Sequence, residues 1–149
     1  MIFRATPQWF LSMEKAGLRR DALAAIKTVR WVPAWGEQRI TSMIETRPDW
    51  CISRQGAWGV PLAMFVHKET GEPHPQTPEL LLKVAALVET GGIEAWFALN
   101  PRTLLGDEAL VYEKCDDVVD VWLDSGVVHH CLPALRPESV GFPAEVYLE

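Results

Sequence analysis

The sequence predicts an α/β fold that is interrupted by a small α+β insertion. Two short runs of almost continuous apolar residues, at 50–53 and 60–67, predict strands, and segments with helical periodicity surround them. Strands of this kind are typical of sheets that are covered on both faces. The 149 residues, 48% of them hydrophobic and 23% charged, are enough for one domain with a packed interior.

The N-terminal third is predicted to be mainly helical. A short strand at 2–6 is followed by a helical pattern over 8–28, with a break near Gly17. A second helix is predicted over 35–47, because its apolar residues recur on one face and Pro48 disfavours helical geometry in the residue before it. These helices are expected to pack on a sheet or on each other.

Residues 68–117 are predicted to form the insertion. Thr77 can cap a helix that has Pro78 at its first position and Gly91 just beyond its end. A strand at 109–113 follows after short, broken segments. The alternation of small helices and strands predicts an α+β subdomain.

The C-terminal part is predicted to return to the sheet. A strand over 118–123 is expected to end in a sharp turn at 124–126, and a further strand is expected over 145–149. Trp122 lies at the end of the first of these strands, where an indole can form the wall of an apolar ligand pocket. Packing in the core is the more common role of tryptophan, and both roles stay open on these grounds.

Charge and cysteine content exclude several classes of protein. The net charge is −6 and the longest basic run is Arg19-Arg20, so no electrostatic surface for DNA or for unspecific RNA binding is expected. Three cysteines without CxxC spacing suit the reducing cytoplasm. No apolar run approaches the ~20 residues of a membrane span, and the first residues lack a signal-peptide pattern.

No metal site and no thiol enzyme are predicted. The potential zinc ligands fit no known spacing: His67, His74, Cys115, His129, His130 and Cys131. The adjacent pair His129-His130 would point to opposite faces of a strand. Neither Cys51 nor Cys131 lies at an obvious helix N-terminus or beside a cationic cluster, so a Cys–His hydrolase is less probable than a packed thiol.

The segment 47–61, Arg-Pro-Asp-Trp-Cys-Ile-Ser-Arg-Gln-Gly-Ala-Trp-Gly-Val-Pro, resembles the block that follows the editing insertion in the isoleucyl-tRNA synthetase family of class I aminoacyl-tRNA synthetases. Other segments match in the same order: 3–10, 35–40, 65–71, 120–126 and 143–149. Valyl and leucyl enzymes share parts of this pattern and stay as alternatives, whereas the segments 3–10 and 65–71 favour isoleucine.

The resemblance implies a partial Rossmann-like nucleotide-binding domain, made of residues 1–67 and 118–149 and interrupted by 68–117. The whole enzyme would use isoleucine, ATP with magnesium, and tRNA(Ile). The family's His-Ile-Gly-His and Lys-Met-Ser-Lys-Ser motifs do not occur in these residues, and the editing domain precedes Met1 in the family order. The fragment alone is therefore expected to be inactive, to hold no cofactor, and to need the missing remainder of the synthetase chain.

Two residues match family positions at the aminoacyl-adenylate. Trp122 matches the tryptophan that packs on the isoleucine side chain, and Glu149 matches the glutamate that contacts isoleucyl-adenylate. Two positions depart from the family pattern, because Gly56 stands where arginine is expected and Leu123 where phenylalanine is expected. These departures remove a guanidinium and an aromatic ring.

Two non-enzymatic hypotheses accompany this one. A synthetase-derived binding module would keep a closed fold, but the chain stops inside a strand motif that continues into Gly-Ser-Asp-Gln-His in the family. A complementing half of a split enzyme would require a neighbouring reading frame that starts near that motif.

Overall fold

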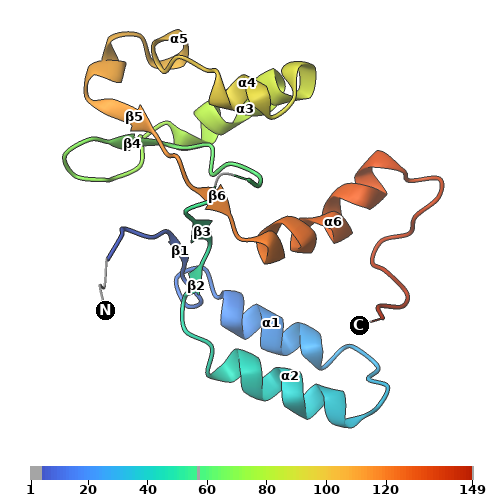
Figure 1. Cartoon of the computed structure of the whole chain (residues 1–149). Coiled ribbons are helices and arrows are strands. Elements are labelled where there is room, and N and C mark those ends of the chain that lie inside the picture. Colours follow the sequence, from blue (N-terminus) through green and yellow to red (C-terminus); the bar gives the residue numbers. More distant parts are fainter. Residues whose placement is uncertain (1–4, 57, 149) are drawn as a thin grey trace. The chain divides into compact units, whose positions relative to one another are not determined.

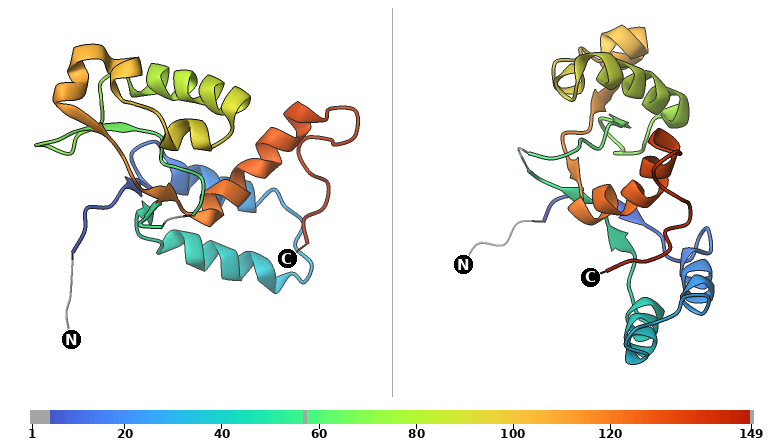
Figure 2. Two further views of the ribbon diagram at one scale, coloured as in Figure 1. Left: turned by 45° about the horizontal axis from the view of Figure 1, so that its top comes forward. Right: turned by 90° about the vertical axis from the view of Figure 1, so that its right-hand side faces the viewer.

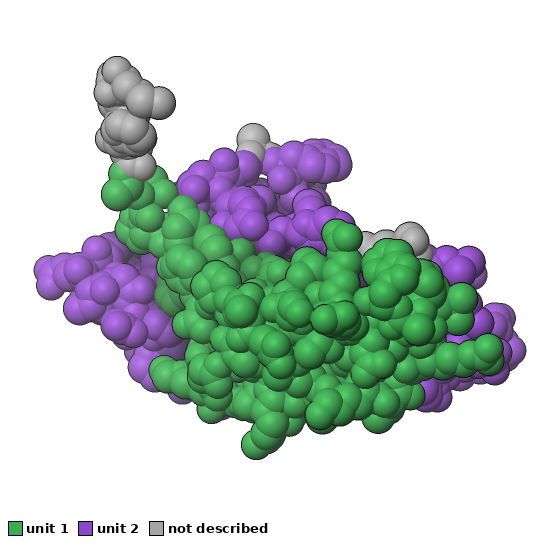
Figure 3. Space-filling view, turned by 90° about the horizontal axis from the view of Figure 1, so that it is seen from below, with its two compact units in different colours: residues 1–52 green, residues 53–149 purple. Residues whose placement is uncertain are grey.

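The computed structural model of the chain describes residues 5–56 and 58–148. Helices alternate with short strands, which pair as three two-stranded antiparallel sheets, β1–β2, β3–β6 and β4–β5 (Figure 1). The predicted mixture of helices and strands is confirmed, and each of these strand pairs is antiparallel. The chain divides into two compact units, residues 1–52 and 53–149, drawn green and purple in Figure 3.

The first unit is a helical hairpin with a small sheet. The helices run in opposite directions side by side (Figure 1 and Figure 2). Its elements are β1 (Phe10–Leu11), α1 (Leu18–Ile26), α2 (Trp35–Glu45) and β2 (Trp50–Cys51). The helix predicted at 35–47 is confirmed. The helix predicted over 8–28 begins only after Gly17 (φ 74°), because residues 10 and 11 pair with Cys51 and Trp50 instead.

Arg19 joins the two helices of this unit. Its guanidinium donates hydrogen bonds to the carbonyl oxygens of Ile44, of Glu45 at 3.1 Å and of Arg47 at 2.8 Å. These carbonyls lie at or just beyond the end of α2, where the last turn of a helix has no partners of its own. A cation there also interacts favourably with the helix dipole. Arg19 therefore caps α2 from α1.

Arg19→Ala is expected to lower the free energy of unfolding by about 1.5–3 kcal/mol, the usual range for hydrogen bonds to a charged group. The side chain is only 20% exposed, so water replaces these bonds poorly. Urea denaturation followed by circular dichroism measures the effect. Arg20→Ala is the matched control: that side chain is exposed, and it donates a hydrogen bond to the exposed Asp21, whose carboxyl pKa it lowers. Equal shifts in both variants would contradict the capping role.

The second unit contains the other elements. They are β3 (Ser53–Arg54), β4 (Phe65–His67), α3 (Thr77–Gly91), α4 (Glu94–Phe97), α5 (Arg102–Leu105), a 3₁₀ helix (Gly106–Leu110), β5 (Tyr112–Lys114), β6 (Val118–Val119) and α6 (Val121–Leu135). Its hydrophobic core consists of Phe65, Leu80, Val84, Trp96 and Leu105. The rings of Phe65 and Trp96 meet edge to face, with centroids 5.4 Å apart. The core thus joins β4 to residues between 68 and 117. The limits of the insertion at 68 and 117 stay a prediction.

Two lysines tie the ends of short helices in this unit. Lys68 Nζ donates to the carbonyl oxygens of Ala109 and Leu110, at 3.0 and 2.7 Å. Lys114 Nζ donates to the carbonyl oxygens of Trp96 and Phe97, at 2.8 and 2.9 Å. Both ammonium groups satisfy carbonyls that a short helix leaves unpaired.

Helix α3 confirms the helix predicted after residue 77, with Pro78 in its first turn, but Gly91, expected just beyond the helix end, is its last residue and Gly92 is the C-cap. The cap differs: Gln76 is the N-cap residue, and the Thr77 hydroxyl donates to the carbonyl of His74 instead. The strand predicted at 109–113 is wrong over its first half, because residues 106–110 form the 3₁₀ helix and β5 begins at Tyr112.

The largest correction concerns the segment after β6. The strand predicted over 118–123 ends at Val119, and α6 begins at Val121. Asp124, Ser125 and Gly126, expected to form a sharp turn, lie inside this helix. No strand occurs at 145–148, and the strand predicted at 2–6 falls mainly outside the described residues, with none at 5–6.

Within the described residues, no helix combines the length and the apolar character that crossing a bilayer requires.

Candidate functional site

The site is built on the pairing of β3 with β6. Ser53 is opposite Val119 and Arg54 is opposite Val118, in antiparallel register. Gln55 Nε2 donates to Asp117 Oδ1 at 3.2 Å, and the Val119 amide donates to the carbonyl of Val60 at 2.8 Å. The pairing places residues 53–55 beside residues 117–119, directly before the segment 120–126.

Asp120 is the buried polar residue at the end of β6. Its side chain is 5% exposed, and its two carboxylate oxygens have different partners. Oδ2 accepts a hydrogen bond from Arg54 Nη2 at 2.9 Å, and Oδ1 accepts one from the Trp122 amide at 3.3 Å. Asp120 is thereby the N-cap residue of α6. A buried carboxylate needs such partners, because burying an unpaired charge is costly.

Trp122 lies in the first turn of α6 rather than at the end of a strand. Its side chain is 66% exposed, so packing in the core of this unit does not account for it. Two residues further along the same turn, Asp124 lines a cavity of about 480 Å³. The lining of that cavity does not include Trp122 itself.

The cavity near the start of α6 has an aromatic and acidic lining. It is formed by Trp58, Gly59, Val60, Ile93, Glu94, Phe97 and Asp124. Trp58 is 93% exposed and presents its indole at the surface. Gly59 has φ 137°, and a Cβ there would lie 3.2 Å from the side chain of Val118, so glycine allows this close approach. The volume suits a small ligand, and the carboxylates of Glu94 and Asp124 can accept hydrogen bonds from a cation.

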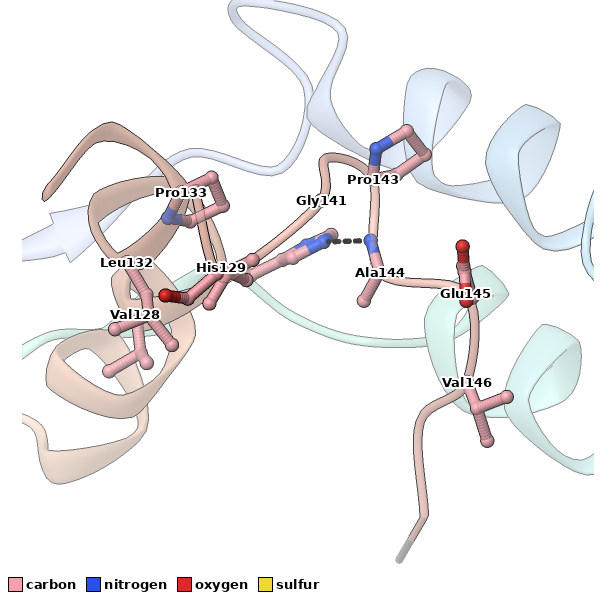
Figure 4. Close-up of a pocket in the computed structure, with 11 residues that line it drawn as sticks. Val128, His129, Leu132, Pro133, Gly141, Pro143, Ala144, Glu145 and Val146 are labelled. Atoms are coloured by element: carbon pink, nitrogen blue, oxygen red, sulfur yellow. Dashed lines mark hydrogen bonds between the residues drawn. The ribbon is translucent and has the colours of Figure 1, made fainter. Parts of the chain in front are cut away.

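A second cavity, of about 580 Å³, lies between the later turns of α6 and residues 139–146 (Figure 4). His129 points across it, and its Nε2 accepts a hydrogen bond from the Ala144 amide at 2.9 Å. The ring of Phe142 lies 5.2 Å from the His129 ring. Because Nε2 is the acceptor, the neutral imidazole carries its proton on Nδ1.

The histidine and cysteine side chains singled out in the sequence lie in different surroundings. Among residues 5–56 and 58–148, no group of three or more His, Cys, Asp or Glu side chains is arranged to hold an ion. His74 is buried and contacts Glu108, with 3.3 Å between Nε2 and Oε2. Of the three thiols, Cys115 is buried, Cys51 is partly buried and Cys131 is exposed.

Sequence analysis missed the residues that connect this site. Arg54 and Trp58 lie in the segment 47–61, but no role was assigned to either. Asp120 carries a recognisable signal, because aspartate is among the preferred N-cap residues. The valines on both sides of Asp120 favour a strand instead. Glu149 lies outside the described residues, so its predicted contact with the adenylate stays a prediction, as does that of Trp122.

Comparison with known proteins supplies the context for this geometry. The family model for class I tRNA synthetases (I, L, M and V) matches residues 1–149. The chain is 60% identical to an isoleucine-tRNA ligase of Nitrosococcus oceani over 149 residues, and 60% identical to one of Idiomarina loihiensis over 150. An isoleucine-tRNA ligase of Coxiella burnetii is 57% identical over 149 residues. Each match covers 100% of this chain, which spans 16% of the length of these curated relatives.

Proposed function

Since this chain belongs to the class I tRNA synthetase family (I, L, M and V), we propose that it is part of the aminoacylation domain of an isoleucine-tRNA ligase. The observation that carries the proposal is the identity of 60% with such ligases along all 149 residues. The finer architecture belongs to the same proposal: residues 1–67 and 118–149 contribute to a Rossmann-like sheet that other parts of the polypeptide complete.

In the proposed reaction, a carboxylate oxygen of isoleucine attacks the α-phosphorus of ATP and pyrophosphate leaves. A ribose hydroxyl of tRNA(Ile) then attacks the carbonyl carbon of the adenylate, and AMP leaves. Magnesium accompanies ATP as part of the substrate. No phosphate step is assigned to residues 1–149, because their contribution lies on the amino-acid side.

The amino-acid side of the site is assigned to the cavity at the start of α6. Trp58 provides an aromatic wall, and Trp122 projects from the helix turn that also carries Asp124. An aliphatic side chain packs well against an indole ring, and burying it is worth roughly 1.5–3 kcal/mol. Asp124 and Glu94 lie where a carboxylate can accept hydrogen bonds from the substrate ammonium. Glu149 is assigned to the adenylate on family resemblance alone.

Such a pocket favours isoleucine over valine only modestly. One methylene is worth about 1–3 kcal/mol in a hydrophobic pocket, a general magnitude for which isoleucine against valine is itself the standard example. Isoleucine is therefore expected to react best, with valine as the strongest competitor.

The test is isoleucine-dependent exchange of pyrophosphate into ATP. The ligase polypeptide that carries these residues is expected to exchange with isoleucine, more weakly with valine, and hardly with leucine. A purified polypeptide of residues 1–149 alone is expected to show no exchange, because its sequence has neither family signature motif for ATP. A preference for valine or leucine in the ligase would refute isoleucine specificity. Clear exchange by residues 1–149 alone would refute the proposal that the ATP-binding motifs lie in other parts of the polypeptide.

A further inference from the structure

The carboxylate of Asp120 connects two parts of the site that are far apart in sequence. One oxygen accepts a hydrogen bond from Arg54 in β3, and the other accepts one from the amide of Trp122 in α6. The main-chain carbonyl of Asp120 also accepts from the amides of Leu123 and Asp124, at 2.9 and 3.3 Å. The whole first turn of α6 is therefore organised around this residue.

Helix α6 has little else to fix its orientation. None of its fifteen residues, all of them described, is buried, and the exposed fraction of its hydrophobic side chains rises to 77% at Leu135. A helix is normally oriented by the apolar face that it buries. In this unit the hydrogen bonds of Asp120 orient α6 instead, because Asp120 is the buried polar residue at the start of the helix.

The wall of the cavity opposite α6, formed by Trp58 and Gly59, is joined to the same pair of residues, Arg54 and Asp120. Trp58 and Gly59 follow Arg54 in the chain, and the close approach of Gly59 to Val118 holds this segment against β6. The distance between the Trp58 wall and the first turn of α6 thus depends on the pairing of β3 with β6 and on the ion pair that joins Arg54 to Asp120.

We infer that Arg54 and Asp120 are a pair of positioning residues: they fix the first turn of α6, which carries Trp122 and Asp124, relative to the Trp58 wall and so tune the affinity for the amino acid. Neither residue of the pair belongs to the cavity lining, so the pair acts through its neighbours. The inference rests on the proposed function for its effect on amino-acid affinity. Its effect on the position of Trp122 can be measured without any activity.

The kinetic test uses Arg54→Ala, Asp120→Asn and the double variant in the ligase. Asparagine keeps the N-cap acceptor, so α6 still begins at its usual residue, while the ion pair is lost. Each single variant is expected to raise the KM for isoleucine about tenfold, because displacement of a positioned group by about 1 Å has effects up to roughly a hundredfold. The KM for ATP and kcat are expected to stay within about twofold. The double variant is expected to be no worse than either single one, since both remove the same pair.

Lys68→Met is the matched control for a purely structural effect. Lys68 ties the end of the 3₁₀ helix in the same unit and has no contact with the cavity. This variant is expected to lower the thermal midpoint and to leave the KM for isoleucine unchanged. An equal rise in KM for Lys68→Met, or a KM within about twofold of wild type in both pair variants, would overturn the inference.

A spectroscopic readout separates this inference from the proposed function. The protein is labelled with 5-fluorotryptophan, and the Trp122 resonance is assigned from its loss in Trp122→Phe. Arg54→Ala and Asp120→Asn are expected to shift or broaden this resonance without substrate, whereas Lys68→Met is not. If the wild-type ligase that carries these residues shows no isoleucine-dependent exchange, the proposed function fails, and the fluorine spectrum alone decides whether the pair holds Trp122. An unchanged Trp122 resonance in both pair variants would refute the positioning role.

Discussion

Trp96→Ala is expected to lower the free energy of unfolding of the second unit by about 3–5 kcal/mol, the range for removing a large aromatic side chain from a core. Trp96 is 1% exposed, and its ring meets Phe65 edge to face. The ammonium of Lys114 lies 5.2 Å from the centre of the Trp96 ring and donates to the Trp96 carbonyl. Domains of this size are stable by roughly 5–15 kcal/mol, so the loss removes a large share of the total.

Urea denaturation of residues 1–149, monitored by circular dichroism, measures this loss. The matched control is Trp35→Ala, because Trp35 is 64% exposed and lies outside the core cluster. That control is expected to change the free energy of unfolding by less than about 0.5 kcal/mol. A comparable loss in both variants would show that tryptophan content as such, rather than this core, stabilises the chain.

Trp122→Ala is expected to reduce kcat/KM for isoleucine in the ligase by about 10–100-fold, which corresponds to about 1.4–2.8 kcal/mol of lost apolar contact. The KM for ATP is expected to stay unchanged, because the indole contacts the amino acid in the proposed complex. Trp122→Phe is expected to lose less, since it keeps an aromatic face. Initial rates of pyrophosphate exchange at varied isoleucine and varied ATP give both constants.

Loss of stability is not expected to disturb this measurement. Trp122 is 66% exposed in the second unit, so its removal leaves no cavity in the core. Trp35→Ala again serves as the control, with a similarly exposed indole outside the proposed site. An unchanged kcat/KM for isoleucine in Trp122→Ala would remove this residue from the amino-acid pocket.

The parts of the fold that sequence analysis predicted have strong local signals. Helix α3 has proline in its first turn and glycine at its end, and α2 has a regular apolar stripe before Pro48. Helix α6 was missed because its sequence favours other structures. It contains several valines, Gly126 and Pro133, and the run Val118–Val121 is typical of a strand. The local signs of a helix start are aspartate at the N-cap and Asp124 in the first turn, and the valines outweigh them.

The site was predicted only as far as family resemblance reached. The assignment of Trp122 to the isoleucine side chain stays a prediction, and its neighbours in the structure follow from no local pattern in the sequence. The contact between Arg54 and Asp120 joins positions 66 residues apart, and no local pattern in a single sequence reports such a distance. The role of Trp58 also depends on the conformation of Gly59, which allows the approach to Val118.

The two ends of the segment between β3 and β6 lie side by side, because residues 60–62 bond to residues 117–119. The amide of Leu62 donates to the carbonyl of Asp117 at 2.9 Å, directly beside the bond from Val119 to Val60. A loop closed at its base in this way changes length at little entropic cost, about 0.6 kcal/mol for each doubling. The segment between positions 63 and 116 can therefore gain or lose residues at low entropic cost, provided that the core residues and the cavity-lining residues Ile93, Glu94 and Phe97 are kept.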